Sequence, residues 1–334
     1  MLDVPAWLWA VFAGSVVVML LIDLFAHRRA HVIGFREAAT WSAVWVAAAL
    51  VFAGLVWASL GTGAAVEFTT AWLLEKSLSV DNLFVFALIF GYFAVPREHQ
   101  HRALFYGVIG ALVFRAIFIA AGVAIVSKFT AVLFVFAAIL LWSAYKLMKD
   151  DDDEYDPQKN LAVRLVRKVI PVQTEYSGAK FFVRAAGRWV ATPMFVVVVA
   201  IEAADLVFAV DSVPAVLAVS DDTFIVYSSN AFAILGLRAL YFFLSGMLDK
   251  FHFLSKGLAI ILGFIGFKLI LQAAHKTISA SIPEIPSLVS LAVVVTVLAA
   301  SVLLSLTRPA PTEVEQAADK ADEDREQLAR GGSR

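Results

Sequence analysis

Long apolar blocks alternate with short polar breaks along this chain, as they do in membrane proteins built from helices. Helix-length windows place nine spans at residues 6–26, 39–60, 66–94, 103–126, 130–148, 193–218, 223–247, 254–274 and 286–306. Most of these segments approach or exceed the roughly 20 residues that cross a hydrocarbon core of ~30 Å. The pattern therefore predicts an all-α polytopic membrane protein.

Composition supports this class. Of the 334 residues, 61% are hydrophobic and 16% are charged, whereas soluble domains have about 45–50% and about 25%. The chain contains no Cys, which excludes disulfides and thiolate metal sites. The net charge is −1 and no basic stripe carries interleaved aromatic residues, so we expect a lipid bilayer around the protein and no nucleic acid partner.

Basic residues predict the orientation. They gather after the first, third, fifth and seventh spans, and the intervening breaks hold few of them. Positive charge favours the cytoplasmic side of a membrane. We therefore expect an outside N-terminus and a cytoplasmic C-terminus, in the cytoplasmic membrane of a bacterium.

Polar stretches and an internal repeat divide the chain further. We expect a two-span N-terminal region at 1–65, a three-span repeat at 66–148, a cytoplasmic loop at 149–192, a second repeat at 193–275, a final span at 276–307 and a disordered cytoplasmic tail at 308–334. The loop opens with the acidic run 150–154, which is either a solvated segment or a low-affinity ion sensor.

Four ordered landmarks indicate the repeat. The matched positions are Glu75 and Asp81 with Asp205 and Asp211, Arg115 with Arg238, Lys128 with Lys250, and Lys146 with Lys268. Each copy holds three predicted spans, so the second copy enters the membrane from the opposite side. Inverted repeats of this kind recur in secondary transporters, with the substrate site near the midplane. An old duplication in a membrane protein that does not transport would leave the same pattern.

Five acidic residues fall inside predicted spans, where ionisable groups are costly and are candidates for function. They are Glu75 and Asp81 in the third span, and Glu202, Asp205 and Asp211 in the sixth. Residues six apart lie about 240° round an ideal helix, so these carboxylates would diverge on straight helices. In the sixth span Pro214 frees the carbonyl of Val210, and in the third Ser77 and Ser79 can bond to loosened backbone, so we expect both helices to be interrupted and the acids to converge.

Converging carboxylates and carbonyls would form an all-oxygen site, to which Asn82 and Ser212 add neutral oxygens. Such ligands suit Mn²⁺, Ca²⁺ or Mg²⁺ rather than copper or zinc. The six histidines fall in loops or at helix ends, which further disfavours zinc.

The alternative is that the acids form ion pairs. Arg115 and Arg238 lie within predicted spans, and Lys76 lies beside Glu75. Asp23, near the end of the first span, is either a gating residue or the partner of Arg28. Five acids exceed two buried arginines, so we expect at least three of them to bind the ion.

The segments Glu75-Lys-Ser-Leu-Ser-Val-Asp-Asn-Leu-Phe-Val and Glu202-Ala-Ala-Asp-Leu-Val-Phe-Ala-Val-Asp-Ser-Val-Pro-Ala resemble the signatures of the TerC/Alx family of integral membrane proteins. The resemblance covers roughly residues 1–306. It implies manganese export, with Glu75, Asp81, Asn82, Glu202, Asp205, Asp211 and Ser212 around the ion.

The sequence thus favours a secondary transporter that exports a divalent ion, with Mn²⁺ expected and protons as the counter-ion. Neighbouring membrane carboxylates raise one another's pKa and can exchange a proton for a cation. No nucleotide-binding loop supports an ATP-driven pump. The alternatives are a membrane assembly or stress factor without transport and, with no supporting motif, an intramembrane hydrolase. Oligomeric state is left open.

Overall fold

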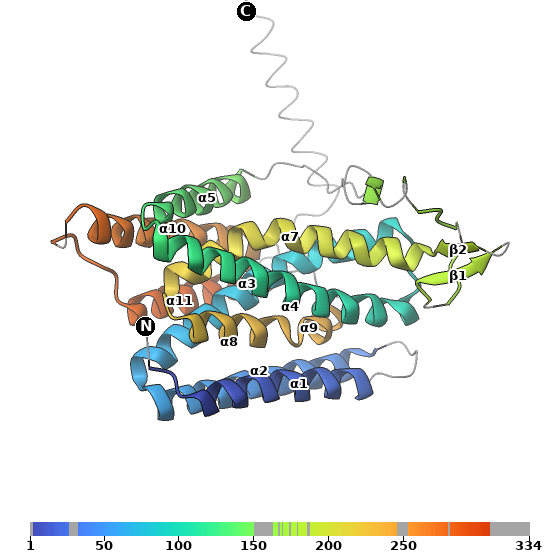
Figure 1. Cartoon of the computed structure of the whole chain (residues 1–334), viewed down its shortest axis with the longest axis horizontal. Coiled ribbons are helices and arrows are strands. Elements are labelled where there is room, and N and C mark those ends of the chain that lie inside the picture. Colours follow the sequence, from blue (N-terminus) through green and yellow to red (C-terminus); the bar gives the residue numbers. More distant parts are fainter. Residues whose placement is uncertain are drawn as a thin grey trace, which may run out of the picture.

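A computed structural model describes residues 3–26, 33–149, 163–165, 168, 170–173, 175–178, 180–185, 188–245, 253–279 and 281–307. The helices are α1 (Ala6–Ala26), α2 (Phe35–Leu60), α3 (Thr62–Tyr92), α4 (Arg97–Lys128), α5 (Val132–Met148), α7 (Pro193–Val219), α8 (Thr223–Ile234), α9 (Leu237–Leu244), α10 (Leu254–Thr277) and α11 (Ser287–Thr307). Two strands, β1 (Phe182–Ala185) and β2 (Arg188–Ala191), form an antiparallel hairpin near the start of α7 (Figure 1).

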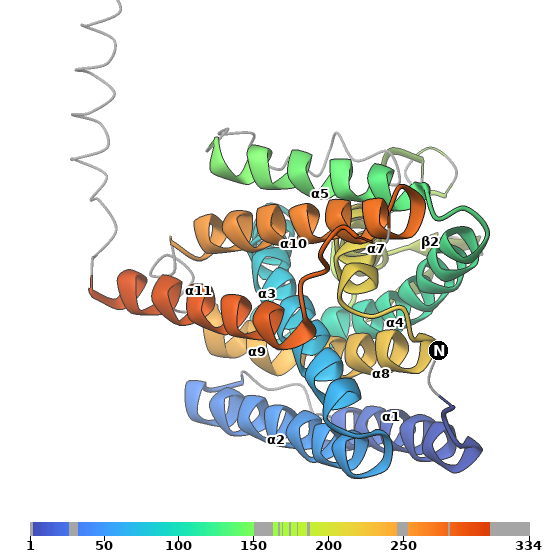
Figure 2. The ribbon, with the colours of Figure 1, turned by 90° about the vertical axis from the view of Figure 1, so that its left-hand side faces the viewer.

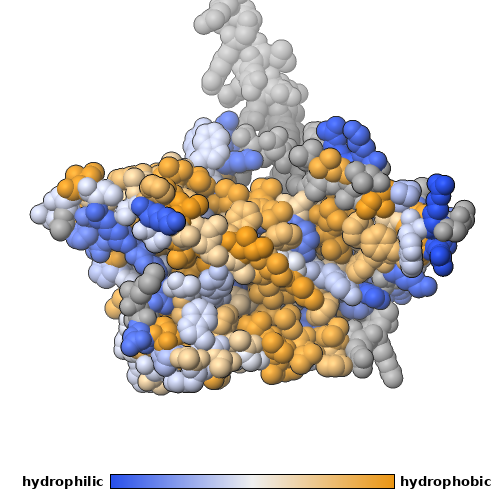
Figure 3. Space-filling view, in the orientation of Figure 1, coloured by the Kyte–Doolittle hydropathy of each residue, from blue (hydrophilic) through white to orange (hydrophobic). Residues whose placement is uncertain are grey.

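The described helices are those of a polytopic membrane protein. Six of them, α1, α2, α4, α7, α10 and α11, are long and apolar enough to cross a bilayer, and the bent pair α8–α9 makes a seventh candidate. The nine spans expected from the sequence are reached only if α3 and α5 also cross the bilayer. Helix α3 has 31 residues and four charges, and α5 has 17 residues. Figure 3 shows hydrophobic residues over much of one face, between hydrophilic residues at its left and right ends.

The expected interruptions of the third and sixth spans are wrong. Both α3 and α7 run without a break, and α7 continues through Pro214. The break lies instead between α8 and α9, which meet at 41°. Gly236 adopts φ +92° at that junction, a left-handed conformation that glycine adopts without a steric penalty.

Two layers of packing surround α3 (Figure 2). On one side α1, α2, α3 and α8 share a cluster of rings, in which Phe52 stacks on Phe232 with centroids 4.5 Å apart. On the other side α5 lies along α10, where Gly266 leaves room for Leu141 and Gly263 faces Ala144. Small residues at helix contacts let backbones approach closely within membranes. This arrangement places α3, α4 and α7 at the centre of the protein.

The segment expected as a loop at 149–192 contains structure that its sequence did not indicate. The hydroxyl of Tyr176 donates to the main-chain oxygen of Phe93 at 2.7 Å, which fastens the segment before the hairpin to the end of α3. Burial raises the pKa of Tyr176 to about 12, so the hydroxyl keeps its donor proton. The acidic run 150–154 and the expected tail 308–334 lie outside the described residues.

Candidate functional site

Arg115 of α4 joins two of the predicted acids at the centre of the protein. Its side chain is 1% exposed and forms an ion pair with Glu75 of α3. It also donates to both carboxylate oxygens of Asp205 in α7, from Nη2 at 3.0 Å and from Nε at 3.4 Å. A third donor, Nη1, reaches the hydroxyl of Ser212 at 3.1 Å. One guanidinium therefore holds α3, α4 and α7 together through charge-assisted bonds.

Asn230 extends this network to α8. Its Nδ2 donates to Oε2 of Glu75 at 3.1 Å, and its side chain is 2% exposed. Asn230 is not among the residues predicted from the sequence. A signal was present, since a carboxamide inside a predicted membrane span must find a polar partner when it is buried.

Glu202 lies one helical turn before Asp205, on the same face of α7. Its Oε2 is buried without a hydrogen-bond partner among the described residues. Space for the carboxylate comes from Gly110 of α4, because a Cβ at that position would overlap it. Glu202, a third predicted acid, is thus held in a glycine notch beside the Arg115 network.

Asp211 lines a cavity of about 410 Å³ between α3, α5, α7 and α10. Ser143 donates to its Oδ1 at 2.7 Å. Asn82, Lys146 and Ser212 line the same cavity, and Ser212 connects it with Arg115. Asp81 lies in α3 one residue before Asn82, and its side chain is outside the described set.

Three further predicted residues have partners away from this centre. Lys76 donates to the main-chain oxygen of Ala233 at 3.1 Å, at the end of α8. Arg238 pairs with the carboxylate of Asp23 and donates to its carbonyl at 2.9 Å, which ties α9 to α1. Among the described residues, Asp23 thus has a partner 215 positions along the chain, whereas its predicted partner Arg28 lies outside them.

Not all of the predicted ligands can be placed, because the side chain of Asp81 is outside the described residues. Among the described side chains, no group of three acids or histidines is placed to hold an ion. Glu75 and Asp205 instead converge on the guanidinium of Arg115. The structure thus pairs Glu75 and Asp205 with Arg115, with Glu202 one turn away on α7 and Asp211 in the adjoining cavity.

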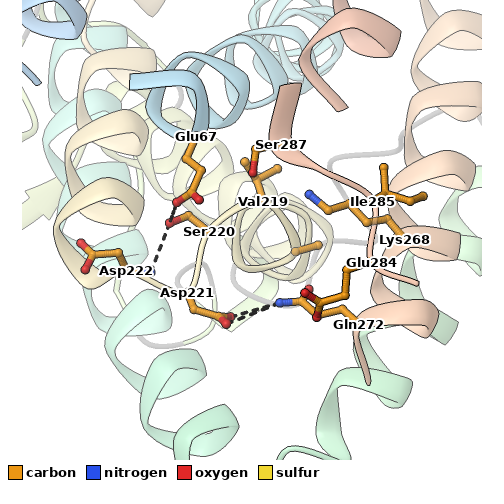
Figure 4. A pocket seen from close by; sticks show the side chains of 11 residues that line it. Glu67, Val219, Ser220, Asp221, Asp222, Lys268, Gln272, Glu284, Ile285 and Ser287 are labelled. Carbon is orange, nitrogen blue, oxygen red and sulfur yellow. Dashed lines mark hydrogen bonds between the residues drawn. The ribbon is translucent and has the colours of Figure 1, made fainter. Parts of the chain in front are cut away.

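A second polar cavity, of about 360 Å³, lies near the other end of α7 (Figure 4). Residues from α3, the 220–222 connection, α10 and the 284–287 segment line it, among them Glu67, Ser220, Asp221, Lys268, Gln272 and Glu284. This cavity is not among the sites predicted from the sequence, although the acids in the short connections that line it were a signal for it. Residues 213–217 of α7, all buried, separate the two cavities.

Comparison with known proteins places this arrangement in a family. The model of the integral membrane protein TerC family matches residues 60–312. "Uncharacterized membrane protein STKORF319" of Myxococcus xanthus is 43% identical over 308 residues, covering 91% of this chain and 94% of that protein. "Putative membrane-bound redox modulator Alx" of Escherichia coli K12 is 42% identical over 286 residues, covering 82% and 89%.

The protein of the same name from Photorhabdus laumondii is 41% identical over 303 residues, covering 87% of this chain and 94% of that protein. No solved structure matches the chain significantly. With most of its length matched by the family model and by these relatives, the chain belongs to the TerC family of integral membrane proteins.

Proposed function

We propose that this protein is a secondary transporter that exports a divalent metal ion, with Mn²⁺ as the ion and protons as the counter-ion. The observation that carries the proposal is the buried cluster of Arg115, Glu75 and Asp205, which Ser212 links to the polar cavity that holds Asp211. Ionisable residues at membrane depth are costly and mark ion pathways and proton relays. Carboxylate and amide oxygens suit a hard divalent ion.

Helix packing supports the inverted repeat that the sequence predicts. In the proposed scheme α3, α4 and α5 form one copy, and α7, the pair α8–α9 and α10 form the other. The contact of α4 with α7 then corresponds to that of α8 with α3, and α5 packs on its own counterpart α10. In this scheme α3, α5 and the bent pair each cross the membrane, which gives nine spans.

The role of Arg115 follows from its charge. While no ion is bound, its guanidinium pairs with both Glu75 and Asp205, which offsets part of the cost of burying two carboxylates. An arriving cation would take over this task, release Arg115 and draw Asp211 and Asn82 toward the ion. Glu202, in the notch of Gly110, is then the carboxyl that carries the proton.

The buried segment 213–217 of α7 separates the cavity beside Asp211 from the cavity beside Glu67. Alternating access requires such a barrier, which one repeat opens by moving against the other. By the distribution of basic residues, the Asp211 cavity would face the cytoplasm and the Glu67 cavity the outside.

The name of the Alx relatives describes a membrane-bound redox modulator. This chain has no Cys, so thiol–disulfide exchange, which requires a thiolate, is not open to it. Any effect of this chain on redox state would have to act through another group or through ion movement.

The decisive experiment is Mn²⁺ flux into proteoliposomes that contain an internal Mn²⁺-sensitive dye and carry a pH gradient. We expect saturable flux in the wild type and its loss in Asp211→Asn, which keeps the side-chain volume and removes the charge. Asp3→Asn, an exposed change outside α1, is the matched control and should transport normally. If the wild type moved neither Mn²⁺, Ca²⁺ nor Mg²⁺, the transporter proposal would fail in favour of an assembly or stress factor.

A further inference from the structure

The cavity beside Glu67 contains a lysine whose environment differs from that of the other described lysines. Lys268, from the middle of α10, is 6% exposed, and Figure 4 shows its amine directed into the cavity. No hydrogen bond and no ion pair within 4 Å involves it among the described residues. The carboxylates whose fields act on it are those of Glu67, Glu284 and Asp221. A buried ammonium that faces acids without touching them occupies a space suited to a cation.

We propose that this cavity is a second binding site for a divalent cation, whose place Lys268 holds as a tethered ammonium until the ion enters. The inference rests on the proposed function, because it takes the transported ion as the ligand. It adds a site to the transport path at the end of α7, beyond the buried segment 213–217.

The acids that line the cavity fall into two groups, those that already cap a helix or form an ion pair and those that do neither. Asp222 caps α8 by accepting from the main-chain nitrogens of Phe224 and Ile225. Asp221 pairs with Lys276 on the rim of the cavity. Glu67 and Glu284 have no ion-pair partner among the described residues. These two carboxylates therefore provide the charge for an incoming ion.

Neutral oxygens complete the ligand set. Oε1 of Gln272 is buried without a hydrogen-bond partner among the described residues, and its Nε2 is directed toward Asp221 at 3.5 Å. Ser220 donates to Oε2 of Glu67 at 2.7 Å, which fixes that carboxylate against the wall. Carboxylate, amide and water oxygens are the donors that hard divalent ions prefer. The volume of about 360 Å³ leaves room for an ion that keeps several waters, each of about 30 Å³.

The corresponding cavity supports the same use of lysine. Lys146 and Lys268 are matched positions of the sequence repeat, and Lys146 lines the cavity that holds Asp211. Among the described residues, the cavity of Lys146 has one carboxylate, that of Asp211, and the cavity of Lys268 has four; in each, the lysine comes from the third helix of a repeat. In each, an ammonium can balance the acids when the ion is absent and move aside when it arrives.

The test counts Mn²⁺ sites by electron paramagnetic resonance, which detects free Mn²⁺, on the full chain in lipid nanodiscs. We expect two classes of site in the wild type. Glu67→Gln with Glu284→Gln should remove one class, since glutamine keeps an oxygen for Ser220 but loses the charge. Asp211→Asn should remove the other class and leave the first.

Three results separate this inference from the proposed function. If the wild type binds no Mn²⁺, both are overturned. If Asp211→Asn removes all binding and the glutamine pair changes none, only the second site is overturned. If each change removes its own class of site, the second site is established, whether or not ions flow.

A second variant tests the role of the lysine directly. Lys268→Gln removes the competing charge, so we expect the affinity of the second site for Mn²⁺ to rise about tenfold, which corresponds to about 1.4 kcal/mol. Lys128→Gln, an exposed lysine at the end of α4, is the matched control and should leave affinity unchanged. An unchanged or weaker affinity in Lys268→Gln would show that the ammonium does not compete with the ion.

Discussion

At the scale of single residues, the sequence identifies the charged positions but not their partners. The acids of α3 and α7 follow from the cost of ionisable groups in a membrane. Their pairing with Arg115 was the alternative to ion binding, and the structure shows that pairing for Glu75 and Asp205. Asn230 and Ser143 come from helices α8 and α5 and meet the acids only through tertiary packing. Spacing along one chain cannot reveal such meetings.

Replacing Arg115 would leave two carboxylates buried without their counter-charge. We expect Arg115→Met to lower the free energy of unfolding by about 3–5 kcal/mol, the usual effect of removing one partner from a buried ion pair. Thermal unfolding in detergent measures the loss. Adding Glu75→Gln and Asp205→Asn should restore most of the stability but not the transport. The exposed Arg36→Gln serves as control. Full stability of Arg115→Met with both acids intact would contradict the role given to the guanidinium.

A second prediction for a single residue concerns the space beside Gly110. Its missing side chain leaves the space for the Glu202 carboxylate, so Gly110→Ala should force that carboxylate to move. Overpacking of this kind costs about 1–3 kcal/mol, and we expect Mn²⁺ flux to fall with it. Glu202→Asp, which shortens the acid, should relieve the crowding in the double variant. Gly54→Ala, a helical glycine with open space around it, should have no such effect on flux. Equal Mn²⁺ flux in Gly110→Ala and Gly54→Ala would show that the space beside Gly110 plays no part in transport.

At the scale of elements, hydrophobic periodicity predicts most of the helices to within a few residues. The first predicted span, 6–26, has the observed bounds of α1, and the second begins four residues late relative to α2. The interruption expected in α7 is wrong because a proline removes one hydrogen bond without ending a well-packed helix. The one expected in α3 is also wrong: this helix has no proline, and its Ser77 donates to the carbonyl of Leu73 within the helix. The bend at Gly236 and the hairpin β1–β2 were missed, since glycines and short strands give weak signals in a single sequence.

The bend between α8 and α9 depends on Gly236 in two ways. Its φ of +92° disfavours any side chain, and a Cβ there would lie 2.8 Å from the ring of Trp45 in α2. We expect Gly236→Ala to destabilise the protein by more than the 1–2 kcal/mol or so of left-handed strain alone. A double-mutant cycle with Trp45→Gly separates the terms, because the excess should vanish when both the ring and the Cβ of Trp45, each 2.8 Å away, are absent. A cost independent of Trp45 would assign the whole effect to the backbone.

At the scale of the whole molecule, the sequence predicts a membrane protein of the right family, whereas the paths through it depend on the packing of its helices. The two polar cavities are formed by residues from four or more segments each, so no local pattern outlines them. The sequence does predict which side of the membrane each cavity faces. The basic residues place the Lys256 end of α10 inside and the Glu284 end outside. Alternating access requires that each cavity open to one side of the membrane only.

The absence of Cys makes this relation directly measurable, because each introduced cysteine is the only thiol in the chain. Ser287→Cys lies in the Glu67 cavity and Ser255→Cys in the Asp211 cavity. A membrane-impermeant maleimide should label Ser287→Cys in intact spheroplasts, and should label Ser255→Cys and the exposed Lys180→Cys only after permeabilisation. Labelling of both cavities from the same side would refute a path that joins them across the membrane. Labelling of each from its own side would fix the orientation and leave the movement of segment 213–217 as the step that connects them.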